Sequence, residues 1–238
     1  GIDERSARKA EELYRSFVKG EIFLTDARTA EMVKLAENAF RDLNIAFANE
    51  LSRICHKLGV DVWKVIELAN KHPRVNILKP GPGVGGHCVA VDPWFIVEKA
   101  PEDARLIRTA RGINDSQPEY VVQRIERLIK GIENPKILIL GVAYKGNVSD
   151  ARESPSLKVI GLLEGKGYDV SAYDPHIGGY DCGVEEAFRG VDCVVLLTEH
   201  KEFKELDPSL IAPLVRHKIV FDAKSFLDKE RWQINGFK

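Results

Sequence analysis

The run Lys136-Ile-Leu-Ile-Leu-Gly141 marks the point where the hydrophobic pattern of this chain changes. Short runs of branched apolar residues are typical of strands that are buried on both faces of a parallel sheet. Three more such runs follow, at Tyr168–Tyr173, Asp192–Leu197 and Lys218–Phe221. Helical patterns separate the runs, at Ser156–Gly165, Val184–Phe188 and Pro208–Val215. This alternation predicts a Rossmann-like, doubly wound parallel α/β sheet over residues 133–238.

Residues 27–132, which precede this sheet, have helical patterns and are predicted to form a central all-helical domain. The longest pattern, Thr29–Leu58, is apolar on more than one face, which suits the centre of a helical domain or a subunit interface. We expect Gly59 to end this helix and Asp61 to cap another that runs to Lys71. Further helices are predicted at Asp103–Asn114 and Gln117–Lys130.

Residues 1–26 have the pattern of one helix, Asp3–Lys19, followed by one strand, Glu21–Thr25. A single helix and a single strand cannot bury their apolar faces alone. Because position 1 is not methionine, we expect this pair to be the last αβ unit of a domain whose earlier part is absent from the sequence. The alternative is that both elements pack on the helical domain that follows.

The segment Lys79–Trp94 contains a candidate nucleophile, Cys88, directly after two glycines and a histidine. Gly85 and Gly86 remove side chains where the backbone would have to approach a ligand closely. A thiol in such a loop is more accessible than a core cysteine, and thiolates are strong nucleophiles. The competing interpretation is a buried, inert cysteine beside a turn.

The same loop contains Gly81, Gly83 and Gly86, which satisfy the dinucleotide pattern G-x-G-x-x-G. That pattern requires a strand before it and a helix after it. Arg74–Leu78 is short for such a strand, and His87–Pro93 does not have the pattern of a helix start. We therefore do not assign a dinucleotide site to this loop.

Two further groups of polar residues are candidate binding sites. The loop after the first predicted strand contains Tyr144, which could stack on a base, with Lys145 and Arg152 for phosphate. On the long helix, Lys34, Asn38 and Arg41 recur at a spacing that places them on one face. In both places the alternative is a set of solvated polar side chains.

Composition excludes several classes of function. The 35 basic and 36 acidic residues nearly cancel, so bulk charge favours neither a nucleic-acid nor a membrane partner. No apolar run is long enough to span a bilayer. The four cysteines form no C-x-x-C pair, which predicts reduced thiols in a cytoplasmic protein, and we predict no metal site.

Three motifs resemble those of the UDP-glucose/GDP-mannose dehydrogenase family: Glu37–Asn44, Pro80–Cys88, and Gly141–Lys145 with Arg152–Pro155. The resemblance extends in order over almost the whole chain and is greatest to the branch that acts on UDP-N-acetyl-D-mannosamine. It implies an N-terminal NAD-binding domain, a central dimerisation domain and a C-terminal UDP-binding domain. Residues 1–26 would then be a remnant of the first domain, and the chain alone is expected to be inactive.

The resemblance also implies the chemistry, a four-electron oxidation of a sugar C6 alcohol to a carboxylate with NAD as the acceptor. Cys88 would form a thiohemiacetal with the intermediate aldehyde and then a thioester, which water cleaves. Lys34 and Asn38 match family positions that stabilise the developing oxyanion, and Lys34 also takes part in proton transfer. Asp92 matches a carboxylate that assists the hydrolytic water.

The same resemblance assigns the binding residues. The positions that match UDP-sugar contacts within one subunit are Arg41, Gly85, Tyr144, Lys145 and Lys224. His72 and Arg74 match positions that the neighbouring subunit contributes, which implies a homodimer or a larger assembly such as a tetramer. Arg152 matches a residue that reaches toward NAD.

Several alternatives remain open from the sequence. The substrate could instead be UDP-GlcNAc, UDP-glucose or GDP-mannose. The chain could be a dimeric UDP-sugar-binding fragment without redox activity. A Cys–His hydrolase that uses Cys88 with His56 or His87 is disfavoured, because no Asn or Asp at a recognisable spacing would orient the histidine.

Overall fold

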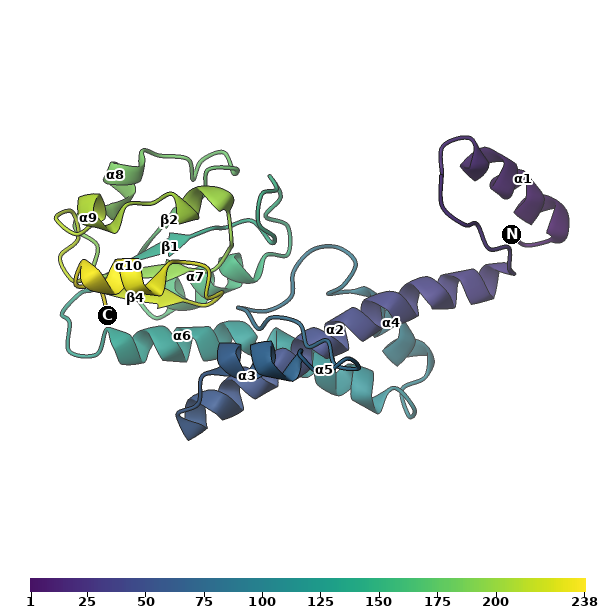
Figure 1. The fold of residues 1–238 in the computed structure, drawn as a ribbon, viewed down its shortest axis with the longest axis horizontal. Coiled ribbons are helices and arrows are strands. Elements are labelled where there is room, and N and C mark those ends of the chain that lie inside the picture. The colour runs from purple at the N-terminus through teal and green to yellow at the C-terminus, as the bar shows by residue number, and fades with distance from the viewer.

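The computed structural model describes residues 1–238 and shows a helical part joined to an α/β part (Figure 1). The helices of the first part and of the connection are α1 (Glu4–Arg15), α2 (Ala27–Leu58), α3 (Val62–Ala69), α4 (Asp92–Lys99), α5 (Arg105–Asp115) and α6 (Gln117–Leu128). None of the helices in the chain is long and apolar enough to cross a membrane.

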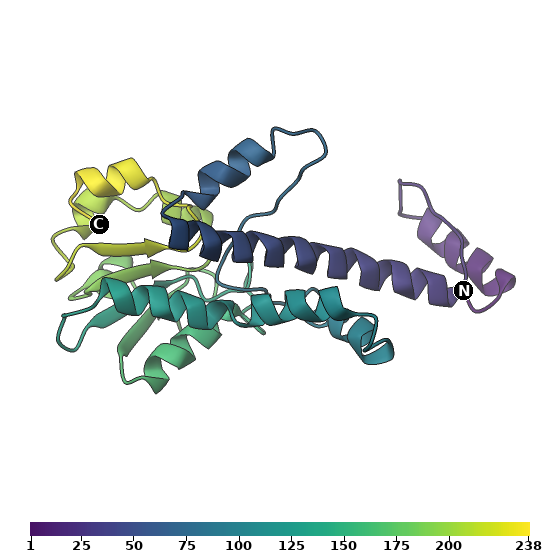
Figure 2. The same ribbon diagram turned by 90° about the horizontal axis from the view of Figure 1, so that it is seen from below.

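The long helix α2 is the axis of the helical part, and α5 packs along it (Figure 2). Its 32 residues correspond to about 48 Å at 1.5 Å per residue. Asp26 caps its start by accepting a hydrogen bond from the Thr29 N–H, and Gly59 ends it in the left-handed conformation with φ 69°. The Asp61 carboxylate caps α3, so both boundaries predicted around the turn between α2 and α3 are confirmed.

Four parallel strands form the sheet of the second part, in the order β2-β1-β3-β4. They are β1 (Lys136–Leu140), β2 (Asp169–Tyr173), β3 (Cys193–Leu196) and β4 (Ile219–Asp222). Leu140 lies opposite both Tyr173 and Leu196, so the carboxyl ends of the strands meet at one edge. The predicted doubly wound parallel α/β fold is confirmed.

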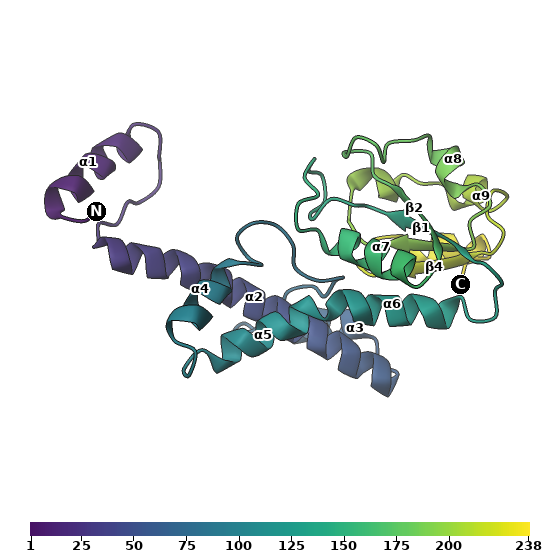
Figure 3. The same cartoon turned by 180° about the vertical axis from the view of Figure 1, so that it is seen from behind.

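Helices cover both faces of this sheet (Figure 3). Ile137 and Ile139 of β1 point to the face covered by α6 and by α7 (Pro155–Gly165). Leu138 and Leu140 point to the opposite face. The elements on that face are α8 (Val184–Phe188), the 3-10 helix η1 (Lys201–Lys204), α9 (Pro208–Ile211) and α10 (Lys229–Ile234). Since α6 packs on the sheet as well as following α5, it connects the two parts.

The structure corrects the sequence predictions at several elements. Glu21–Thr25 forms no strand, because the only strands of this chain lie in the C-terminal sheet and a strand needs a hydrogen-bonding neighbour. The helix before it, α1, stands apart from the rest at the far end of α2 (Figure 1). Three elements were missed: α4, η1 and α10. Of these, α4 matters most, because it begins four residues after Cys88.

Candidate active site

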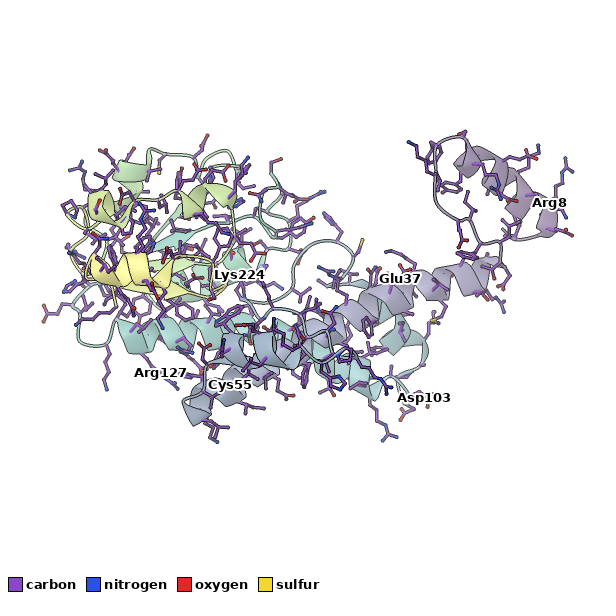
Figure 4. The ribbon with its side chains drawn as sticks, in the orientation of Figure 1. Arg8, Glu37, Cys55, Asp103, Arg127 and Lys224 are labelled. Atoms are coloured by element: carbon purple, nitrogen blue, oxygen red, sulfur yellow. The ribbon has the colours of Figure 1, made fainter.

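A cavity of about 490 Å³ lies where the C-terminal edge of the sheet faces α2 and the glycine-rich loop. Five of the sequence-predicted residues line it together: Arg41, Gly85, Tyr144, Lys145 and Lys224. A second opening of about 620 Å³ shares Arg41 and Lys224 and continues past Trp63 of α3. Figure 4 shows Lys224 on the side of the α/β part that faces the helices.

The cavity carries more positive than negative charge. Lys224 Nζ lies 3.4 Å from the Glu199 carboxylate. Arg41 and Lys145 are exposed and form no ion pair in the structure. Three cations facing one carboxylate, beside the N-terminal end of α7, are suited to an anionic ligand such as a diphosphate.

The glycine-rich loop packs tightly against the loop that follows β1. A side chain at Gly85 would place its Cβ 2.6 Å from the Glu153 carbonyl oxygen and 2.8 Å from Pro155 Cδ. Gly86 has φ 84°, and a Cβ there would lie 3.0 Å from the Tyr144 ring. The absence of side chains at these glycines lets the two loops pack closely, and Gly85 also lines the cavity. The contact fixes the thiol-bearing loop relative to the cavity.

Cys88 is exposed, at the turn that leads into α4. Its carbonyl oxygen accepts hydrogen bonds from the N–H groups of Val91 and Asp92, at 3.0 and 2.8 Å. The Asp92 carboxylate in turn accepts a hydrogen bond from the Asn38 amide, at 2.5 Å. Three of the four predicted catalytic residues are therefore connected. Cys88 is linked to Asp92 by a backbone hydrogen bond at the start of α4, and Asp92 is linked to Asn38 of α2 by a side-chain hydrogen bond.

The other cysteines differ from Cys88 in their surroundings. Cys55 and Cys193 are buried, and burial, with a smaller contribution from Asp192, raises the pKa of Cys193 to about 12. A buried thiol with a raised pKa is a poor nucleophile. Cys182 is exposed, in the segment between β2 and α8. It offers a matched control for Cys88.

The fourth predicted catalytic residue, Lys34, lies on α2 one turn before Asn38. Its ammonium is 3.5 Å from the Glu37 carboxylate, and both side chains are 63% exposed. The structure forms no hydrogen bond or ion pair between Lys34 and Cys88, Asn38 or Asp92.

The four predicted catalytic residues do not line the cavity, and neither do three further predicted residues. His72 and Arg74 are exposed on the loop after α3, where the His72 Nδ1 accepts a hydrogen bond from the Arg74 N–H at 3.3 Å. Arg152 instead binds Asp150 through Nε at 2.9 Å and Nη2 at 2.7 Å. These hydrogen bonds hold the pKa of Asp150 below its ordinary range. His87 lies 3.7 Å from the same carboxylate.

A buried polar network that the sequence reasoning missed holds the start of the glycine-rich loop. The Gly81 N–H donates to the Asn49 side chain at 2.9 Å, and the Asn49 amide donates to Asn114 at 2.9 Å. The Asn114 amide donates to Asp42 at 2.8 Å, and Arg111 donates to the same carboxylate at 2.5 Å. All four side chains are almost completely buried. Burial raises the pKa of Asp42 more than Arg111 and Asn114 lower it.

Comparisons with protein families match both parts of the chain. The model described as the central domain of the UDP-glucose/GDP-mannose dehydrogenase family matches residues 28–116. The model described as the UDP binding domain of the same family matches residues 138–229.

Individual relatives extend this similarity over the full sequence. The chain is 53% identical over 244 residues to a UDP-N-acetyl-D-mannosamine dehydrogenase of Methanocaldococcus jannaschii, covering 100% of this chain and 57% of that protein. It is 47% identical to an NDP-N-acetyl-D-galactosaminuronic acid dehydrogenase of Ralstonia solanacearum, covering 97% of this chain and 56% of that protein.

A solved structure shows the same arrangement. The UDP-D-ManNAc dehydrogenase of Pyrococcus horikoshii superposes with a TM-score of 0.90 at 44% identity, over 96% of this chain and 56% of that one. The chain therefore spans little more than half the length of the curated relatives and solved structures that it matches.

Proposed function

This chain belongs to the UDP-glucose/GDP-mannose dehydrogenase family, and we propose that it provides the UDP-sugar site and the nucleophile of a UDP-sugar 6-dehydrogenase. The observation that supports this most directly is the cavity itself, in which two lysines at the C-terminal edge of a parallel sheet lie together with Arg41 of α2. The exposed thiol of Cys88 follows the loop that forms one wall of the cavity.

We assign the covalent step to Cys88. A thiolate adds to the C6 aldehyde of the sugar and forms a thiohemiacetal, which still carries a hydride on carbon. Transfer of that hydride to an acceptor, with loss of the hydroxyl proton, would leave a thioester, and water would then release the acid and regenerate the thiol. Asn38 would hold Asp92 in place, and the Asp92 oxygen that Asn38 does not bind could accept a proton from the attacking water.

NAD is proposed as the hydride acceptor from the family alone. The residues of this chain do not form a dinucleotide cradle: the G-x-G-x-x-G of the glycine-rich loop neither follows a strand nor begins a helix. We therefore derive no step through NAD, and we propose that these 238 residues alone do not oxidise a UDP-sugar. The proposed division is a remnant of the NAD-binding domain (1–26), a dimerisation domain (27–132) and a UDP-binding domain (133–238). In that arrangement Lys34 would handle protons and Arg152 would reach toward NAD.

We propose UDP-N-acetyl-D-mannosamine as the sugar nucleotide and its uronate as the product. The proposal rests on the names of the Methanocaldococcus and Pyrococcus relatives. The Ralstonia relative, named for a galactosaminuronic acid, makes another N-acetylhexosamine the second candidate. The use of such a substrate, with thiols that form no disulfide, would place the protein in the cytoplasm.

Replacing Lys145 with alanine is expected to weaken the binding of UDP by about ten-fold or more, because a charge-assisted hydrogen bond to phosphate contributes about 1.5–3 kcal/mol. Isothermal titration of this chain with UDP measures the change. Lys158→Ala is the matched control, since Lys158 is an exposed lysine of α7 that does not line the cavity. Equal affinity of the Lys145 variant and the wild type would refute the assignment.

We also propose that two copies of this chain pair through α2, so that His72 and Arg74 complete the site of the partner. Val33, Phe40, Phe47 and Ile54 are spaced seven residues apart on one face of α2. Each is about half exposed or more, and Phe40 is 71% exposed. A continuous exposed apolar stripe of this kind is typical of a helix that pairs with another helix.

The chain is accordingly expected to be dimeric at micromolar concentration, and Phe47→Glu is expected to make it monomeric, because a charge in an apolar helix interface is costly. Light scattering gives the mass of each variant. Leu210→Glu, at an exposed apolar residue of α9 instead of α2, should leave the dimer intact. A monomeric wild-type chain would contradict the shared site.

A further inference from the structure

We propose that His200 is a positioning residue for the loop that binds the phosphates of UDP. Its imidazole connects Asp174, which follows β2, to Asn147, which lies just beyond Tyr144 and Lys145. This inference rests on the proposed binding of UDP by Lys145.

The hydrogen bonds of His200 fix the tautomer of its ring. His200 is fully buried, and its Nδ1 lies 3.0 Å from the Asn147 backbone nitrogen. A backbone N–H can only donate, so Nδ1 accepts and the hydrogen of the neutral ring is on Nε2. That Nε2–H donates to the Asp174 carboxylate at 2.9 Å. Because both nitrogens are engaged, His200 has no lone pair left for a metal, although His176 and Glu202 lie close to it.

Asp174 anchors the beginning of the same loop. The oxygen that accepts from His200 also accepts from the N–H groups of Val142 and Ala143, at 2.7 and 2.9 Å. Its other oxygen accepts from the His176 N–H at 2.8 Å. Burial alone would raise the pKa of Asp174, but the hydrogen bonds from His200 and the backbone lower it to about 2. Asp174 is therefore a carboxylate at neutral pH and holds one end of the loop.

Asn147 anchors the other end. It has φ 61°, a left-handed conformation that is uncommon for residues other than glycine and persists only where the surroundings hold it. Its side-chain oxygen accepts from the Lys201 N–H at 2.9 Å, next to the hydrogen bond with His200. The intervening Gly146 lies against the Glu199 carbonyl, where a Cβ would be only 2.3 Å away.

Together these contacts fix the segment 142–147 against residues 198–201. Tyr144 and Lys145 lie between the two anchors and line the cavity, as do Thr198 and Glu199. A loop that is ordered before the ligand arrives loses less conformational freedom on binding. His200 does not line the cavity, so we assign it a positioning role and no direct contact with UDP.

Two substitutions test the hydrogen bonds of His200 to Asn147 and to Asp174 separately, because each keeps one bond and removes the other. In His200→Gln the amide nitrogen can reach the place of Nε2 and keep a donor for Asp174, but the acceptor for Asn147 is lost. In His200→Asn the side-chain oxygen can take the place of Nδ1 and keep the acceptor for Asn147, but the donor to Asp174 is lost. Both variants of the 238-residue chain are titrated with UDP and melted by circular dichroism.

His200→Gln is expected to weaken the binding of UDP by about ten-fold and to speed amide hydrogen exchange in residues 141–147, because the hydrogen bond from the Asn147 N–H to residue 200 is lost. His200→Asn is expected to melt at a lower temperature yet bind UDP within about three-fold of the wild type. If both variants lose stability but bind UDP like the wild type, His200 is only structural and the inference is wrong.

Lys145→Ala in the same titration separates this inference from the proposed function. If Lys145→Ala weakens the binding of UDP while His200→Gln does not, the positioning role is overturned and the UDP site stands. If the wild-type chain does not bind UDP, both are overturned. Should His200→Gln fail to fold, the test rests on His200→Asn, which retains the hydrogen bond to Asn147. A folded His200→Asn chain that binds UDP about ten-fold more weakly than the wild type would contradict the role of that hydrogen bond.

Discussion

Cys88→Ser is expected to lower the formation of the sugar acid by about a thousand-fold or more, with UDP-sugar affinity changed only a few-fold. Serine keeps the size of the side chain but is not ionised near neutral pH, so the adduct with the C6 aldehyde would not form efficiently. The cavity residues that we propose to bind the nucleotide are unchanged, which is why binding should survive. The test enzyme joins this chain to the N-terminal part of the Methanocaldococcus relative.

Cys182→Ser is the matched control for this experiment, because Cys182 is also exposed but lies between β2 and α8, outside the glycine-rich loop. Cys55→Ala and Cys193→Ala should affect stability only, since both thiols are buried. Turnover to the uronic acid is measured for the four variants, together with any aldehyde trapped by Cys88→Ser. Near-normal turnover in Cys88→Ser would show that the covalent mechanism is wrong for this protein.

The elements that the sequence predicted well are those whose signals are local. Apolar runs such as Lys136–Leu140 have to be buried on both faces, and caps such as Asp61 and Gly59 act within one helical turn. These features predicted the order of the sheet's strands along the chain, the end of α2 and the start of α3. They did not give the packing of α6 on the sheet, since its apolar face would fit either part of the molecule.

The predictions that were wrong or missing depend on distant neighbours. Glu21–Thr25 has a strand pattern but no partner strand in this chain. The helix α4 begins at Asp92-Pro93, with a proline in its first turn. The residue before it, Val91, cannot cap a helix with its side chain, so the usual N-cap signal is absent from the sequence.

The residues of the candidate site also differ in how well the sequence predicts them. The residues that line the cavity, such as Tyr144 and Lys145, came from motifs that are contiguous in sequence. The supporting residues did not. Asp42 and Asn49 are seven apart on α2, so they share a face, but only the partners Arg111 and Asn114 show that this face is buried. His200 likewise acquires its role from Asp174 and Asn147.

Breaking the buried pair of Asp42 and Arg111 should cause the largest loss of stability among single changes in the helical part. Both side chains are 1% exposed, and removing one partner of a buried ion pair costs about 3–5 kcal/mol. Asp42→Leu and Arg111→Met are each expected to lower the free energy of unfolding by this amount in urea titrations. The double variant should lose less than the sum, because it leaves no unpaired buried charge. Additive losses would contradict the pairing.

The two single variants should also respond differently to pH. Burial already raises the pKa of Asp42, and without Arg111 the carboxyl group favours its neutral form even more in the folded state. A group whose pKa is higher in the folded than in the unfolded protein stabilises the fold at low pH and loses that effect as the pH rises through its folded pKa. Arg111→Met should therefore recover stability, relative to wild type, as the pH is lowered. Asp42→Leu should not, since it removes this carboxyl group and leaves Arg111 with only Asp115 as a partner. Parallel pH profiles for the two variants would mean that the cost lies in packing and not in the unpaired charge.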